Sequence, residues 1–164
     1  MATLGPDNGT LTVHTRKGGA AAKAGHNLVI EVTNWRATYD EVSVELSADA
    51  SSLRVRSGSG GISPLGDEEK AGIAQTIDEE VLMGGSIQFR STSVERSGSD
   101  VTVQGELELL GQTAPLGFTL TDDHGHLTGS ATVKQSNWGI KPYTALFGTL
   151  KVRDEVVVEI DARI

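Results

Sequence analysis

Carboxylate and imidazole side chains gather in one short stretch, Asp122-Asp123-His124-Gly125-His126. Such groups bind zinc and other divalent metals, and a metal-bound water would then serve in hydrolysis. A catalytic zinc site also needs a third ligand from elsewhere in the chain. Asp and Gly are equally typical of a tight turn, so a polar hairpin tip explains the same residues. We predict no metal site here and keep a metal-dependent hydrolase only as a third hypothesis.

Two further patterns have the residue types of a catalytic or nucleotide site but not its spacing. The run Gly58-Ser59-Gly60-Gly61 lacks the Lys-Ser/Thr pair of a phosphate-binding loop and the third glycine of a dinucleotide fingerprint. The carboxylates Glu68, Glu69, Asp78, Glu79 and Glu80 lie on a predicted helix whose opposite face is apolar, so a solvated face explains them better than a catalytic pair. No Gly-x-Ser-x-Gly nucleophile motif occurs. The sequence therefore predicts no catalytic residue, no cofactor and no enzyme.

Apolar and polar residues alternate along most of the chain. A period of two is typical of strands with one buried face. The alternation predicts about eight to ten strands. The apolar sets are Leu11/Val13, Leu28/Ile30/Val32, Val42/Val44/Leu46, Leu53/Val55, Ile87/Phe89, Val101/Val103, Leu116/Phe118/Leu120 and Val156/Val158/Ile160.

Short turns separate several of these sets. Ser97–Asp100, Gly111-Gln112 and Asp122–Gly125 carry the Gly and Asp residues that tight turns require. Connections this short join antiparallel neighbours, because a parallel crossover needs a dozen residues or more. We therefore expect an antiparallel sheet.

Residues 67–83 depart from the period of two and follow that of a helix. Asp67 suits an N-cap, and Ile73, Ile77 and Val81 form an apolar stripe. Gly84 or Gly85 can supply the left-handed stop. We expect this helix to cover one end or one face of the sheet.

The length of 164 residues suits one core, so we predict a single all-β domain over residues 1–164. Many short strands with one helix are typical of a barrel or a sandwich. A closed barrel removes exposed strand edges. The pattern alone leaves both architectures open.

Three segments resemble, in the correct order, segments of the YceI-like family. They are Val103–Leu116, Leu127–Ile140 and Asp154–Ile160, and the helix and the strand Ile87–Thr92 also fall in the family's order. The resemblance covers roughly residues 65–164. It implies an antiparallel, lipocalin-like barrel of about eight strands that holds a polyisoprenoid, such as an isoprenoid quinone.

A barrel of about eight strands has an interior that side chains just fill or that holds one narrow ligand. The alternating apolar sets are the candidates for its lining, and the alternative is that they fill a solid core. His26 either caps the barrel opening or is satisfied by local partners. The candidate ligand-binding residues are Leu28, Ile30, Val32, Val44, Leu46, Ile87, Phe89, Val101, Val103, Leu116, Phe118, Leu120, Trp138, Ile140 and Phe147.

The charge balance argues against nucleic acid as a partner. The chain has 14 Lys and Arg against 22 Asp and Glu, a formal net charge of -8. Binding to phosphates or to an anionic membrane surface requires clustered basic residues, and here they are scattered. The absence of cysteine excludes disulfides and thiolate metal sites.

No apolar run approaches the ~20 residues of a membrane span, and no signal peptide is visible. We therefore expect a cytoplasmic protein without a membrane span.

The leading hypothesis is non-catalytic binding or carriage of an elongated apolar ligand, with a polyisoprenoid or other long-chain lipid as the partner. The alternative is a structural or protein-interaction domain with a filled core. A homodimer is left open.

Overall fold

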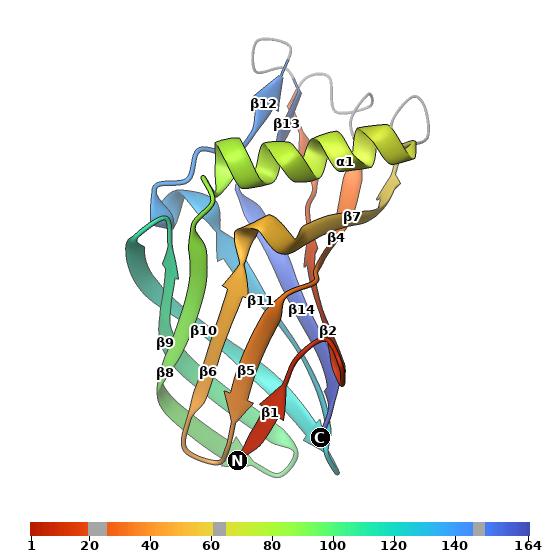
Figure 1. Cartoon of the computed structure of the whole chain (residues 1–164). Helices are drawn as coiled ribbons and strands as arrows, with labels where there is room; N and C mark the ends of the chain where they lie inside the picture. The colour runs from red at the N-terminus through yellow and green to blue at the C-terminus, as the bar shows by residue number, and fades with distance from the viewer. Residues whose placement is uncertain (20–25, 61–64, 146–149) are drawn as a thin grey trace.

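The computed structural model describes residues 1–19, 26–60, 65–145 and 150–164. Within these residues the fold is all-β, with one antiparallel sheet of eleven strands that curls into a barrel (Figure 1). The order across the sheet is β1-β5-β6-β8-β9-β10-β11-β14-β2-β4-β7. The strands are β1 (Ala2–Leu4), β2 (Gly9–His14), β4 (Asn27–Val32), β5 (Trp35–Tyr39), β6 (Val44–Asp49), β7 (Leu53–Ser59), β8 (Ser86–Ser97), β9 (Asp100–Leu109), β10 (Gln112–Asp123), β11 (His126–Lys134) and β14 (Glu155–Arg163).

Eleven strands exceed the eight expected because three stretches of chain bend sharply, and each is divided into two consecutive strands. We call each such pair, and each undivided strand, a ribbon. The divided ribbons are β1–β2, β4–β5 and β6–β7, the last with the short helix η2 (Ala50–Ser52) at its bend. Hydrogen bonds from Thr33 N to Ser52 O (2.9 Å) and from Asp49 N to Asn34 O (3.1 Å) carry the pairing across one corner. Strand count is therefore a poor guide to the number of ribbons in this sheet.

Counted as ribbons, the sheet closes on itself. β6–β7 pairs with β8 on one side and with β4–β5 on the other. β4–β5 pairs next with β1–β2, which pairs with β14, and β14, β11, β10, β9 and β8 follow in turn. Each of these ribbons therefore has two hydrogen-bonded neighbours, which is the condition for a barrel rather than a sandwich.

The predicted hairpin turns are confirmed. Ser97 pairs with Asp100 around Gly98, whose φ is 63°. Leu110 and Gly111 join β9 to β10, and His124 and Gly125 join β10 to β11, all with positive φ. Two consecutive residues with positive φ make a type I′ turn, whose twist matches that of the flanking strands.

The predicted helix is confirmed, with different ends. It consists of α1 (Asp67–Thr76) and the π-helical turn η3 (Ile77–Val81), and α1 lies across the upper end of the barrel (Figure 1). The prediction of Asp67 as N-cap is wrong, because Gly66 occupies that position and Asp67 begins the first turn. Gly84 follows with a φ of 67°, as the predicted left-handed stop requires.

A second, three-stranded sheet lies at the same upper end. It contains β3 (Lys17–Gly18), β12 (Thr144–Ala145) and β13 (Leu150–Val152) in the order β12-β13-β3. Together with α1 it frames the top of the barrel, whereas both chain termini lie at the bottom (Figure 1).

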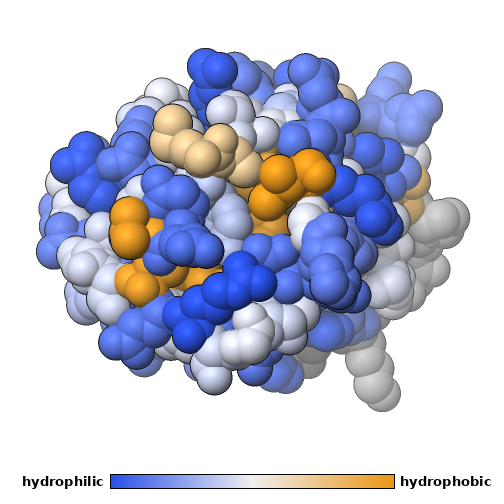
Figure 2. Space-filling model, turned by 90° about the horizontal axis from the view of Figure 1, so that it is seen from below, coloured by the Kyte–Doolittle hydropathy of each residue, from blue (hydrophilic) through white to orange (hydrophobic). Residues whose placement is uncertain are grey.

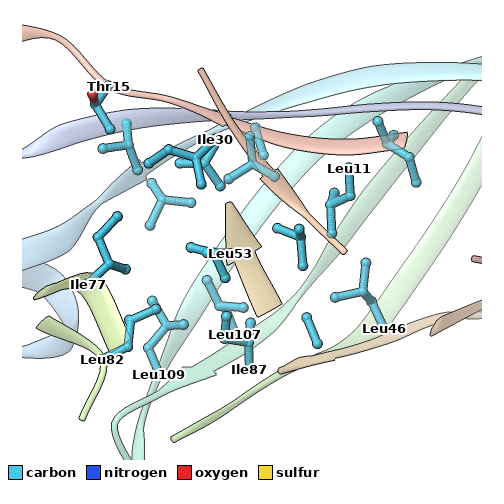
Figure 3. Close-up of a pocket in the computed structure, with 18 of the residues that line it drawn as sticks. Leu11, Thr15, Ile30, Leu46, Leu53, Ile77, Leu82, Ile87, Leu107 and Leu109 are labelled. Atoms are coloured by element: carbon cyan, nitrogen blue, oxygen red, sulfur yellow. The ribbon is translucent and has the colours of Figure 1, made fainter. Parts of the chain in front are cut away.

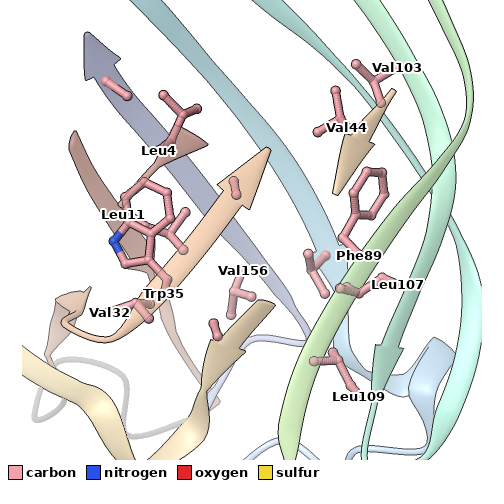
Figure 4. Close-up of a cluster of buried hydrophobic side chains, with 14 of the residues drawn as sticks. Leu4, Leu11, Val32, Trp35, Val44, Phe89, Val103, Leu107, Leu109 and Val156 are labelled. Carbon is pink, nitrogen blue, oxygen red and sulfur yellow. The ribbon is translucent and has the colours of Figure 1, made fainter. Parts of the chain in front are cut away.

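Buried apolar residues from several strands form one cluster inside the barrel, part of which is drawn in Figure 4. Leu4 and Leu11 lie beside Trp35 on one side, and Val44 and Val103 lie beside Phe89 on the other. Val42 does not belong to the buried set expected from the alternation. It is 79% exposed, in the turn where its backbone N–H donates to the Asp40 carboxylate at 2.8 Å.

Candidate ligand-binding cavity

A cavity of about 760 Å³ occupies the interior of the barrel (Figure 3). Alternating residues of the strands supply its walls, and the apolar stripe of α1 and η3 supplies its cover. Along β9, for example, every second residue from Val101 to Leu109 is buried and the residues between them are exposed. The wall is therefore a direct consequence of the period of two.

Most of the predicted ligand-binding residues lie in this wall. They come from four strands, β4, β6, β8 and β10, and from the segment after η4 (Gln135–Trp138). Those that line the cavity are Leu28, Ile30, Val32, Val44, Leu46, Ile87, Phe89, Leu116, Phe118, Leu120 and Ile140.

Val101 and Val103 are buried in the core but do not line the cavity. The prediction that both side chains point into the barrel was correct, but they lie away from the cavity along the barrel axis. The ring of Phe89 lies against Gly105, so that a Cβ there would meet its Cζ at 2.6 Å. This ring packs against that of Phe118, the register partner of Val103, with the centroids 5.2 Å apart. The two rings fill the space in front of lower β9.

Trp138 is also placed in the core rather than in the cavity wall. Its indole N–H donates a hydrogen bond to Leu107 O at 2.6 Å. The ring therefore anchors η4 against β9, which explains its burial without a ligand. Phe147 lies outside the described residues.

Several lining residues were missed by the sequence analysis. The alternation of β14 was recognised, but its inward residues were left out of the ligand-binding set. The apolar stripe of the helix was also recognised, but not its orientation toward the cavity. β1 and β5 were not predicted at all. The missed residues include Leu4, Leu11, Val13, Tyr39, Leu53, Ile73, Ile77, Leu82, Leu107, Leu109, Val156, Val158 and Ile160.

A polar network closes the lower end. The Tyr39 hydroxyl donates to Asp122 Oδ2 at 3.1 Å, and Arg96 Nη1 donates to the same oxygen at 3.0 Å. Gly125 N donates to Asp122 Oδ1 at 3.1 Å. Because β6, β8 and β9 separate β5 from β10 in the sheet, the Tyr39–Asp122 bond crosses the floor of the barrel. From below, this end shows mostly polar surface with small apolar spots (Figure 2).

The network shifts the pKa values of both its acidic groups. Burial opposes ionisation of Asp122, but hydrogen bonds from Gly125, Tyr39 and Arg96 outweigh it and lower the pKa of this carboxyl. Burial, together with the hydrogen bond to Asp122 and its charge, raises the pKa of the Tyr39 hydroxyl. The carboxylate and the neutral phenol are thus the forms that the fold stabilises.

This network also bears on the metal hypothesis for the turn between β10 and β11. Asp122 is engaged with Tyr39 and Arg96, and His126 lies 2.8 Å from Asp161 on β14. The His124 side chain is 98% exposed. In the described residues, no group of three or more His, Cys, Asp or Glu side chains is placed to hold a metal ion. The hairpin-tip interpretation accounts for these contacts.

The upper end is framed by polar side chains from three elements. Thr15 lies between β2 and β3, Lys17 on β3, Glu69 on α1 and Gln135 on η4, and all line the cavity. His26, which precedes β4, lines it as well. We call this end the mouth. Among the residues that the structure describes, no helix is both long enough and apolar enough to cross a bilayer.

Comparison with known families decides the classification. The model of the YceI-like domain matches residues 12–164. The chain belongs to the YceI-like family. The match extends the resemblance seen in residues 65–164 to almost the whole chain.

A solved structure supports the fold. The crystal structure of Burkholderia cenocepacia BcnA is 14% identical in sequence, with a TM-score of 0.62 over 93% of this chain and 94% of that one. At this identity the likeness concerns the fold alone. No curated protein matches the chain.

Proposed function

We propose that this YceI-like protein binds and carries an elongated apolar ligand, a polyisoprenoid or an isoprenoid quinone, inside its barrel, without catalysing a reaction. The observation that carries the proposal is the cavity of about 760 Å³, whose walls from the mouth to the Tyr39 floor are largely apolar. Pockets for small organic ligands commonly have volumes of about 300–1,000 Å³.

The cost of such a cavity supports an apolar occupant. Space without packing atoms costs about 24 cal/mol per Å³ in a protein core. At that rate even a dry portion of about 250 Å³ would cost roughly 6 kcal/mol. This is comparable with the roughly 5–15 kcal/mol by which a whole domain is stable. An apolar chain that fills the space removes this penalty, and water does not, because the walls offer it few partners.

The aliphatic walls suit a hydrocarbon chain rather than a compact polar molecule. Each buried methylene contributes about 0.8 kcal/mol, or roughly 4 kcal/mol for a five-carbon isoprene unit. Ordering a flexible chain offsets much of this gain. A few buried units nevertheless suffice for tight binding.

The two other hypotheses are less well supported. A filled core is at odds with the cavity, and a hydrolase at the β10–β11 turn is at odds with the contacts of Asp122 and His126. The cytoplasmic location and the homodimer stay predictions, which cell fractionation and analytical ultracentrifugation would test.

A filling variant tests the proposal. Ala131 on β11 lines the cavity beside its register partner Val158 on β14. The next residue, Thr132, is exposed on the outer face of the barrel. We expect A131F to weaken binding of a long-chain isoprenoid alcohol at least tenfold in titration calorimetry, and T132F to leave it unchanged. Circular dichroism controls for folding. Equal binding by folded A131F and T132F contradicts a site inside the barrel.

A further inference from the structure

Polar groups are unevenly distributed along the cavity. Thr15 and Gln135, which are 7% and 9% exposed, lie at the mouth together with Lys17, which is half-buried. Figure 3 shows the Thr15 oxygen at the end where Ile77 and Leu82 lie, whereas Leu11 and Leu46 line the opposite end. A bound molecule therefore meets different chemistry at its two ends.

Thr15, Lys17 and Gln135 form one wall of the mouth. Arg153 lies between the two segments that carry them. Its N–H donates to Arg16 O at 2.8 Å and its Nε to Lys17 O at 3.2 Å. On the other side, Gln135 Nε2 donates to Arg153 O at 3.2 Å. These bonds fix Thr15, Lys17 and Gln135 as one group rather than as separate rim residues.

Two donors, the Thr15 hydroxyl and the Lys17 ammonium, and one acceptor, Gln135 Oε1, are left for a ligand at this wall. Thr15 Oγ1 accepts the Leu28 N–H at 3.2 Å, so its hydroxyl hydrogen is available to a ligand. Among the ion pairs of the described residues, none involves the Lys17 ammonium. The Gln135 amide nitrogen is engaged, which leaves its Oε1 as an acceptor.

Glu69, on the α1 side of the mouth, does not neutralise this wall. A Cβ on Gly66 would lie 2.6 Å from Glu69 Oε2, so the carboxylate is folded back on the helix N-terminus. A half-buried lysine that lines an apolar cavity favours an anion, because charge-assisted hydrogen bonds are stronger where water is partly excluded.

We infer that the ligand is an amphiphile with an anionic head group, a carboxylate or a phosphate, which Lys17 and Thr15 bind at the mouth while the apolar tail runs toward Tyr39. This inference rests on the proposed function. It adds a direction of binding and a charge to a site whose walls select only for length and apolarity.

Matched ligand pairs test the charge. The probes are a long-chain isoprenoid monophosphate with its alcohol, and a long-chain fatty acid with its methyl ester. We expect wild-type protein to bind the anion of at least one pair about tenfold more tightly than its neutral counterpart. The pair that shows the preference identifies the head group.

Two variants test the assignment to Lys17. K17Q should lower the affinity for the anion close to that for its neutral counterpart. R16Q, which changes the adjacent but exposed side chain, should keep the tenfold preference. A K17R variant should restore it, because the charge returns.

Equal binding of anion and neutral counterpart by wild-type protein overturns the inference and leaves the proposed function standing. An R16Q variant that loses the preference as fully as K17Q also overturns it, because the effect is then general electrostatics. Binding of none of the four probes overturns both the inference and the proposed function.

Discussion

The network at the barrel floor makes a stability prediction that depends on one carboxylate. Asp122→Ala removes the acceptor of three hydrogen bonds, from Tyr39, Arg96 and Gly125. The side chain of Asp122 is only 12% exposed, so water replaces these bonds poorly. The Tyr39–Asp122 bond joins β5 and β10, which are not neighbours in the sheet. Its loss therefore also removes a direct link between opposite walls at the floor of the barrel.

The magnitude follows from the burial of each partner. A hydrogen bond to a charged group contributes about 1.5–3 kcal/mol, which applies to the buried Tyr39 hydroxyl. The Arg96 side chain is 41% exposed, so its ion pair contributes only about 0–1 kcal/mol. With the Gly125 bond included, D122A should destabilise the fold by roughly 3 kcal/mol. Tyr39→Phe, which removes one bond, should cost roughly 1.5 kcal/mol.

Urea denaturation followed by circular dichroism measures both values. A loss of roughly 3 kcal/mol corresponds to a fall in Tm of roughly 6–12 °C for a chain of this size. Asp123→Ala is the matched control, because the neighbouring carboxylate is 72% exposed and should change stability by less than about 0.5 kcal/mol. If D122A and D123A are equally stable, the floor network does not hold the barrel together and the reasoning is refuted.

Three other predictions concern pH, a close contact and a strained turn. The pKa of Asp122 is lowered in the fold, so the stability that its ionised form contributes is complete above the unfolded value of 3.8 and is lost as pH falls through the folded pKa. The pKa of Tyr39 is raised, so the stability that its neutral form contributes is complete below the unfolded value of 10.0 and is lost as pH rises through the folded pKa. Urea titrations across pH should show both losses in wild-type protein and smaller losses in Y39F/D122N, where the lowered pKa values of Asp40 and Asp49 still contribute at low pH, and identical profiles would contradict them. Gly105→Ala should destabilise by about 2 kcal/mol or more, because the new methyl group meets Phe89 and Arg90 O; a thermal melt within 2 °C of wild type would exclude this packing. His124→Gly should stabilise by about 0.5 kcal/mol, since an exposed residue with φ of 51° gives way to glycine; calorimetry showing a loss would count against strain there.

Local sequence patterns predicted much of this fold. The strand alternation, the hairpin turns and the helix depend on residues a few positions apart, and each was visible in the sequence. The inward face of β9 was predicted correctly because side chains alternate strictly along a strand.

The errors concern relations between distant residues. No local signal shows that Phe89 covers Gly105, so Val103 was predicted to line the cavity and Leu107 was missed, although of the two only Leu107 reaches it. Nor does the sequence show that Tyr39 and Asp122, 83 positions apart, meet at the floor. Depth along the barrel is a property of the closed sheet, and alternation carries no information about it.

The central claim is that the barrel holds an elongated apolar molecule. Native mass spectrometry of the full chain, purified without added lipid and then extracted with organic solvent, tests it most directly. The account predicts one long-chain lipid per protein, reduced in A131F but not in T132F. Wild-type protein that carries no lipid, and that binds none of the isoprenoid or fatty-acid probes when they are added, would contradict it.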